Sequence, residues 1–294
     1  MFLTNSSWNT IQGNFIGVAA DGSIALGNGN GFAGFHAVEI QAGSHDNIIG
    51  GSLPGAGNRI AFAPFTNGIN FAGIRARDGS TNNLLSGNSI FSNGGLGIDL
   101  GSVYLVTTND NCDADIGANM LQNFPVLTQA VSGNGIGVRG TLNSKPSSAF
   151  LLQFFASPVC DSLQYGEGQI FLGEKSVATD GGCNASFVAK LTGAVPPGFV
   201  ITATATDGAN NTSEFSACVP VVAAPALSIS AAATHQVNLV WSTNVTGFVL
   251  KQTGSLSPPI LWNAVTNTPV VANSQFIVSL PVATTNNFYT LSFE

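Results

Sequence analysis

Three aspartates form the densest acidic stretch of the chain, at Asp110, Asp113 and Asp115. A hard cation such as Ca²⁺ binds roughly six to eight oxygen atoms, which Asp and Asn side chains of one loop supply together with backbone carbonyls. The stretch lacks the frame and the terminal Glu of an EF-hand loop. We therefore expect either a structural Ca²⁺ site at these residues or a solvated turn that connects two domains. Asp207 and Glu214, which flank the turn at 208–211, are weaker candidates for a second ion.

A second constellation consists of Glu39, Arg75 and Asp99, each in the middle of an apolar-x-apolar triplet. If the triplets stack as neighbouring strands, the three side chains form a column on the outer face of one sheet, about 4.8 Å apart. Two carboxylates at such distances are what glycoside hydrolysis needs. These residues are therefore the catalytic candidates if the protein is an enzyme. A charge ladder that stabilises the sheet explains the same residues, because Arg75 lies between the two acids.

The four cysteines are Cys112, Cys160, Cys183 and Cys218. An even number of cysteines among turn-rich β segments indicates two disulfides and an oxidising compartment, and all three pairings remain open. A zinc site is disfavoured, because no C-x-x-C spacing is present.

Other function classes are excluded by composition and context. Only 8 of the 294 residues are Lys or Arg, and they are scattered, so no basic patch for nucleic acid is expected. No apolar run is long enough for a transmembrane helix. The G-x-G-x-x-G pattern at 29–34 precedes no helix-forming segment, so we interpret it as a turn rather than a nucleotide loop.

The candidate residues of the first 127 positions lie in a repeat. An N-x-I-x-G-N-x-I-like frame recurs at 9–16, 47–50 and 83–90, and apolar-x-apolar followed by Gly-Ser recurs at 38–44, 74–80 and 98–102. These frames predict a parallel β-helix, in which Ile, Leu and Val stack inward from coil to coil. Gly and Asn supply the corners with positive φ, and Asn side chains form ladders there. An antiparallel sandwich with Asn-Gly hairpins is the alternative.

The repeat frames and residues 95–101, 109–115 and 117–127 resemble the end of the right-handed parallel β-helix repeat proteins that many bacteria secrete. Segments 152–157, 160–161, 166–168, 171–173, 201–207 and 211–218 resemble the module that follows the helix in that family. The resemblance covers about residues 9–222. It implies a fold and a secreted location, but no shared biochemical activity.

Two β-sandwich domains are expected after the helix. Strands with alternating apolar residues occupy 149–155, 169–172, 184–188 and 200–206, and in the last of these Thr alternates with Ile or Ala, which predicts one solvated face. After a linker at 222–225, strands that include Trp241, with Trp262 and Pro281, resemble a fibronectin type III-like module. Either Trp is a candidate for sugar binding or for the core.

The sequence thus predicts an all-β chain, with a right-handed parallel β-helix (1–127) followed by two Ig- or fibronectin III-like β-sandwiches (128–222 and 223–294). We expect a non-catalytic, secreted or cell-surface bacterial protein for glycan or surface binding or adhesion, with a polysaccharide or cell-surface glycan as its partner and no nucleic-acid partner. No cofactor is required, and a structural Ca²⁺ is one of the two alternatives for the acidic loop. The alternative is an extracellular polysaccharide lyase or glycoside hydrolase. The first residues lack a signal peptide, and a repeat is already under way at Asn9, so we expect a monomeric, N-terminally truncated part of a longer chain.

Overall fold

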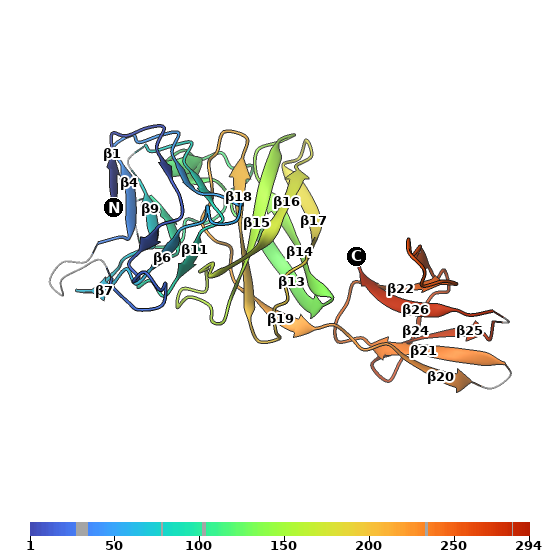
Figure 1. The fold of residues 1–294 in the computed structure, drawn as a ribbon. Helices are drawn as coiled ribbons and strands as arrows, with labels where there is room; N and C mark the ends of the chain where they lie inside the picture. Colours follow the sequence, from blue (N-terminus) through green and yellow to red (C-terminus); the bar gives the residue numbers. More distant parts are fainter. Residues whose placement is uncertain (28–34, 78, 102–103, 233–234, 284) are drawn as a thin grey trace. The chain divides into compact units, whose positions relative to one another are not determined.

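The computed structural model describes residues 1–27, 35–77, 79–101, 104–232, 235–283 and 285–294 (Figure 1). The chain forms two compact units, Met1–Val221 and Val222–Glu294. Both units are built from strands, so the predicted all-β class is confirmed. The glycine-rich pattern at 29–34 lies outside the described residues. In the part of the chain that is described, no helix is long and apolar enough to cross a membrane.

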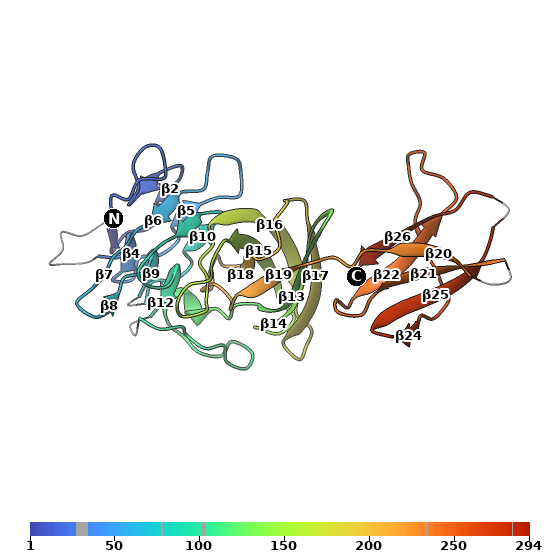
Figure 2. The same ribbon diagram turned by 90° about the horizontal axis from the view of Figure 1, so that it is seen from below.

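The N-terminal part consists of stacked parallel sheets, as the repeat predicts (Figures 1 and 2). Successive coils contribute one short strand to each sheet, and the triplets of the repeat lie in register, with Glu39 opposite Arg75 and Arg75 opposite Asp99. The first sheet contains β1 (Phe2–Thr4), β4 (Val38–Gln41), β9 (Ile74–Ala76) and β12 (Ile98–Leu100). The second contains β2 (Thr10–Ile11), β5 (Ile48–Gly50) and β10 (Leu84–Ser86), and the third β3 (Phe15–Ile16), β6 (Arg59–Ala61) and β11 (Ser89–Phe91). A small hairpin, β7 (Phe65–Thr66) with β8 (Ile69–Asn70), lies between coils.

The interior of the coils is a column of aliphatic side chains. Ile40 packs between Leu3 and Ala76 of the neighbouring coils, because the strands pair without a register shift. Ile49 and Ile60 occupy the equivalent places in the other two sheets and are fully buried. Each coil therefore buries its apolar face against the next coil rather than within itself.

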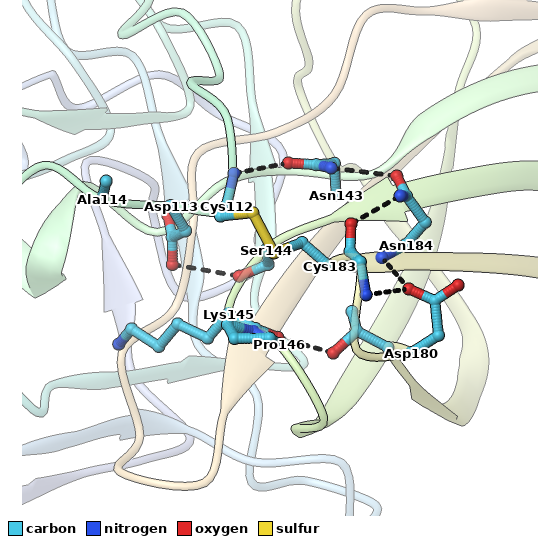
Figure 3. The surroundings of a disulfide bond; sticks show 12 residues. Cys112, Asp113, Ala114, Asn143, Ser144, Lys145, Pro146, Asp180, Cys183 and Asn184 are labelled. Carbon is cyan, nitrogen blue, oxygen red and sulfur yellow. Dashed lines mark hydrogen bonds between the residues drawn. A yellow bond between two sulfur atoms is a disulfide. The ribbon is translucent and has the colours of Figure 1, made fainter.

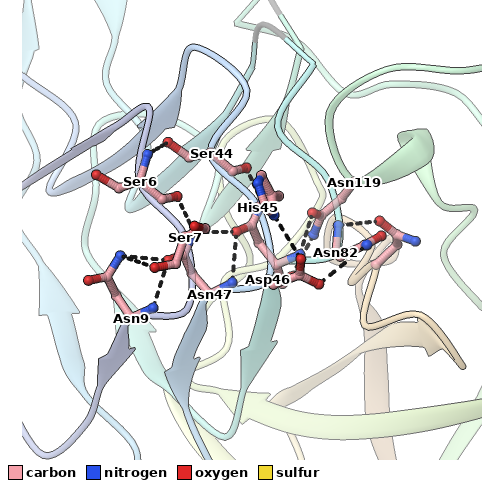
Figure 4. Close-up of polar contacts among 11 residues, drawn as sticks. Ser6, Ser7, Asn9, Ser44, His45, Asp46, Asn47, Asn82 and Asn119 are labelled. Carbon is pink, nitrogen blue, oxygen red and sulfur yellow. Dashed lines mark hydrogen bonds and ion pairs between the residues drawn. The ribbon is translucent and has the colours of Figure 1, made fainter.

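Asparagine ladders run along two corners of the coils, which confirms that prediction, and Figure 4 shows the corner that contains Asn9, Asn47 and Asn119. In the first ladder, Asn9 donates to Asn47 (2.8 Å) and Asn47 donates to Asn83 (2.8 Å), while Asn119 Oδ1 accepts from the Asn83 N–H. The second ladder joins Asn14, Asn58 and Asn88 in the same way. Between the ladders the chain turns tightly at Gly87 (φ 59°), where a Cβ would clash with the Gly51 carbonyl oxygen.

The second part of the N-terminal unit is a seven-stranded antiparallel sheet in the order β16-β15-β18-β19-β13-β14-β17. Its end strands β16 and β17 contact each other, so the sheet closes into a barrel-like sandwich around Phe154, Val138 and Ile201. The strands are β13 (Val126–Gly133), β14 (Gly135–Asn143), β15 (Ala149–Ser157), β16 (Ile170–Ala178), β17 (Asn184–Leu191), β18 (Val200–Asp207) and β19 (Val219–Ala223).

The sandwich covers the last coil of the parallel sheets. Gly168 accepts a hydrogen bond from the Ile90 N–H and Thr212 Oγ1 accepts one from Leu85, while Phe155 and Phe215 enter the core of the coils. The expectation of a solvated Thr face on β18 is wrong for this reason. Thr202, Thr204 and Thr206 are all buried. Thr202 donates to the Glu167 carbonyl, and Thr206 contacts Thr212, which follows the strand.

Two disulfides form in the N-terminal unit, as expected. They pair Cys112 with Cys183 and Cys160 with Cys218, and the described residues include no free cysteine. Disulfides form and persist in oxidising compartments, so the two bonds indicate an extracellular protein.

The C-terminal unit contains two small antiparallel sheets that pack around Leu239, Trp241 and Leu250. Trp241 is 3% exposed, so it belongs to the core. One sheet has the order β20 (Ser228–Ala232), β21 (Gln236–Ser242), β25 (Gln275–Pro281), β24 (Val270–Ala272). The other has the order β23 (Asn263–Ala264), β22 (Phe248–Thr253), β26 (Phe288–Phe293). The three-domain division of the whole chain stays a prediction, because the coils and the first sandwich lie in one compact unit.

Candidate functional site

The acidic loop lies where the coils meet the first sandwich, and the Cys112–Cys183 disulfide ties it to the turn before β17 (Figure 3). The Cys112 N–H donates to Asn143 Oδ1 (2.8 Å), and both Cys112 and Asp113 have positive φ. The loop is therefore fixed at its centre by one covalent bond and one hydrogen bond. Asn123 closes it from the other side, since its amide donates to the Asp110 carbonyl.

This loop brings the three predicted aspartates together. One carboxylate oxygen from each of Asp110, Asp113 and Asp115 lies within 4.8 Å of the others. Asp113 is buried and accepts from the Asn123 N–H (2.8 Å) and Ser144 Oγ (3.0 Å). Asp115 Oδ1 is buried and accepts no hydrogen bond in the described part of the chain.

The loop is an anionic site whose negative charge is offset in part by Lys145, which acts on Asp113. Burial raises the pKa of Asp113 against the opposing effect of its hydrogen bonds, and burial together with the charge of Asp110 raises the pKa of Asp115. Three carboxylates at this distance repel one another, and a divalent cation relieves that repulsion. The loop could therefore hold a metal such as Ca²⁺, with backbone carbonyls and water as the remaining ligands.

The predicted column of Glu39, Arg75 and Asp99 exists, but it does not face solvent as expected. The three side chains are 7%, 2% and 1% exposed. The Tyr104 ring lies 3.9 Å from the Arg75 guanidinium and stacks on His36, so the segment after β12 covers the sheet. The segment that follows a strand can fold back over the outer face of the sheet. The repeat pattern gives no indication that this segment does so.

Each acid of the covered column has an arginine beside it, Arg75 for Asp99 and Arg77, outside the column, for Glu39. Arg75 Nε lies 3.6 Å from Asp99 Oδ2 and donates to the Gly101 carbonyl, and Arg77 Nε lies 2.9 Å from Glu39 Oε1. Burial raises the pKa of Asp99 to about 6, although Arg75 opposes the shift, and burial with the charges of Arg75 and Arg77 lowers that of His36 to about 3. With its side chains buried, the column offers a polysaccharide no access to the carboxylates.

The second pair of acidic candidates serves the fold as well. Asp207 accepts from Asn211 and from Lys145 Nζ (3.1 Å), and Glu214 accepts from the backbone N–H groups of Leu100 (2.8 Å) and Thr107 (2.9 Å). Donors of the protein therefore already occupy both carboxylates.

The C-terminal unit contains an aromatic pocket that the sequence did not predict, although Trp262 was a candidate for sugar binding. The pocket has a volume of about 440 Å³ and opens between the edge strands β20 and β26 of the two sheets. Trp262, Phe288 and Tyr289 line it together with Leu227, Ile229 and Leu256. A signal for it was present in the sequence, because an aromatic pair interrupts the alternation at the start of the last strand.

Comparisons with known proteins leave the family open. No family model matches the chain, and no curated protein matches it. Among the solved structures that match, that of the chicken CNTN1 FN1–FN3 domains is similar at 12% identity and a TM-score of 0.20, over 58% of this chain and 61% of that one.

Proposed function

We propose that this is a non-catalytic secreted or cell-surface protein of modular build, whose C-terminal unit binds a neutral glycan in its aromatic pocket. The observation that carries the proposal is the pocket of about 440 Å³ with Trp262, Phe288 and Tyr289 in its wall. Its volume lies within the range of small-ligand sites.

The chemistry of the pocket fits a sugar ring. Aromatic side chains offer a large apolar area with a polar edge, and the apolar C–H face of a pyranose packs against such a surface. Asn287 and Tyr289 of the pocket wall bring polar groups for the ring hydroxyls, and Ser228 Oγ, which donates to the Val240 carbonyl, could accept from one. Residues 223–294 contain only two charged side chains, Lys251 and Glu294, which form an ion pair with each other. A neutral ligand is therefore favoured over an ionic one.

The remaining parts of the chain support an extracellular role. The sequence resembles secreted bacterial right-handed β-helix repeat proteins and, in its last part, a fibronectin type III-like module, which supports a modular extracellular protein. Both disulfides are consistent with an oxidising compartment. In this proposal Ca²⁺ at Asp110, Asp113 and Asp115 stabilises the junction and takes no part in binding.

The test is binding of the full chain to immobilised neutral polysaccharides, compared with Trp262→Ala. We expect the wild type to bind at least one polymer and Trp262→Ala to lose about tenfold or more in affinity, since the ring supplies much of the contact area. Leu261→Ala is the matched control, because Leu261 is 73% exposed and does not line the pocket. Equal binding by Trp262→Ala and wild type, or no binding by the wild type, would overturn the proposal.

A further inference from the structure

A second pocket lies inside the N-terminal unit, between the end of β11 and the loop that follows β15. Its volume is about 360 Å³. The coils contribute Ser92 and Asn93, and the sandwich contributes Ser157, Asp161, Glu167 and Gln169. The Cys160–Cys218 disulfide holds one wall, and the Asp161 N–H donates to the Gly166 carbonyl (3.0 Å), so the loop that carries both acids is fixed.

Glu167 forms the floor of this pocket. Its side chain is 8% exposed, and Asn93 donates to it twice, from Nδ2 to Oε1 (2.6 Å) and from the backbone N–H (3.2 Å). Its own carbonyl accepts from Ser157 Oγ (3.0 Å) and Thr202 Oγ1 (3.1 Å). The carboxyl group is therefore held in one position before any ligand arrives, which lowers the entropic cost of binding.

The charge in the pocket has one sign. Among the described residues that line it, two are acidic and none is Lys, Arg or His. Burial raises the pKa of Glu167 to about 8 against the Asn93 hydrogen bonds, and the nearby charge of Asp161 adds to the shift. Burial also raises the pKa of Asp161, which accepts from the Leu163 N–H. An incoming cation would interact with both carboxyl groups and displace the proton from Glu167.

We propose that this pocket binds an amino sugar with a free, protonated amine. The ammonium group would lie between Asp161 and Glu167, and the ring hydroxyls would meet Ser92 and Gln169, since the Asn93 amide is already engaged with Glu167 and Ala63. A bare metal ion is too small for the volume, since one water molecule takes up about 30 Å³, whereas the pocket is near the lower end of small-molecule sites. The site is separate from the aromatic pocket in residues, unit and ligand charge, so it goes beyond the function proposed above.

The first experiment is calorimetric titration of the full chain with glucosamine, N-acetylglucosamine and glucose near neutral pH. We expect glucosamine to bind at least about tenfold more tightly than the other two, because only it carries the cation. Asp161→Asn should lose about tenfold in glucosamine affinity, since Asn retains the acceptor for Leu163 but not the charge. Asp180→Asn, an exposed turn aspartate away from the pocket, and Trp262→Ala should bind as the wild type does.

The second experiment measures proton release. Glucosamine binding at about pH 6.5 is repeated in two buffers that differ in ionisation enthalpy. The wild type should release a proton from Glu167, and Glu167→Gln should release none while still folding through the Asn93 contacts. If Glu167→Gln does not fold, Asp161→Asn alone decides the matter. Equal affinity for the three sugars, an unchanged affinity in Asp161→Asn, or no wild-type binding would overturn the proposal, and loss of binding in Trp262→Ala would assign the ligand to the other pocket.

Discussion

The two units of this chain bury different kinds of side chain. In the N-terminal unit the buried set includes Glu39, Arg75, Asp99, Glu167 and Glu214 and a row of asparagines. Among the described residues of the C-terminal unit, Thr253 is the only buried polar side chain, and the core is Trp241 with apolar neighbours. The same charge-poor composition is thus used in two ways.

The difference follows from how the strands are arranged. Parallel coils expose backbone groups at their corners and at the end of the stack, and polar side chains satisfy these groups at fixed positions, as Glu214 does for Leu100 and Thr107. Antiparallel strands joined by short turns satisfy most backbone groups in the sheet itself. The stability of the N-terminal unit should therefore depend on redox state, buried amides, pH and cations, whereas that of the C-terminal unit should depend on none of them.

Reduction of the disulfides should give the largest separation between the units. Both bonds lie in the N-terminal unit and close loops of 71 and 58 residues, so each should contribute about 4 kcal/mol to its free energy of unfolding. We expect calorimetry under reducing conditions to lower the transition of residues 1–221 and to leave that of 222–294 unchanged. Equal shifts of both transitions would contradict the comparison.

Removal of one rung from the asparagine ladder should destabilise the N-terminal unit as well. Asn83 is fully buried, and its side chain accepts from Asn47 and donates to the Ser44 carbonyl, so Asn83→Ala leaves these buried groups without partners and should cost about 2–3 kcal/mol. Chemical unfolding measures this cost. Asn9→Ala, at the exposed end of the same ladder, is the matched control and should cost less than about 1 kcal/mol. Similar costs for the two variants would show that the ladder is not cooperative.

Much of the N-terminal fold could be predicted from the sequence, because its contacts repeat at a local period. The frames around Ile49, Ile60 and Asn83 identify the inward positions and the corner ladders, since a residue in one coil meets its equivalent in the next. The even number of cysteines predicts two disulfides, but a count carries no information on which cysteines pair. The pairing depends on a loop at Cys112 that reaches a turn 71 residues later.

The parts that could not be predicted depend on which segment covers which face. Tyr104 buries Arg75, and the segment around Thr212 buries the Thr face of β18, and neither segment carries a periodic pattern. Glu167 sits in a Gly-Glu-Gly run with no sign that it is buried. The acidic loop was found because its ligands are adjacent in sequence, whereas the aromatic pocket joins Trp262 to residues 26 and 27 positions later.

A pH titration of stability sharpens the comparison further. Burial raises the pKa of Glu167 and Glu214 from 4.5 to about 8. Between these two pH values the folded unit therefore retains protons that the unfolded chain has lost. The stabilisation is complete below the unfolded pKa and is lost as pH rises to about 8, with a slope of up to about 1.4 kcal/mol per pH unit for each carboxyl. Urea unfolding across this range should show a decline for the N-terminal unit only, reduced in Glu167→Gln. A rise with pH would mean that Asn93 holds Glu167 ionised in the folded protein.

Calcium should give the smallest effect, again in one unit. A cation at Asp110, Asp113 and Asp115 binds the folded loop and not the unfolded chain, so a concentration ten times the dissociation constant adds about 1.4 kcal/mol. We expect the melting temperature of residues 1–221 to rise on addition of Ca²⁺ and to fall again with a chelator. Asp115→Asn should abolish the rise, because it removes the charge of the carboxylate whose Oδ1 lacks a protein donor, whereas Asp180→Asn should not. A rise that persists in Asp115→Asn, or appears in the C-terminal unit, would place the ion elsewhere. An unchanged melting temperature would mean that the disulfide and Asn143 alone fix the loop, and that its three carboxylates are tolerated because water still reaches Asp110.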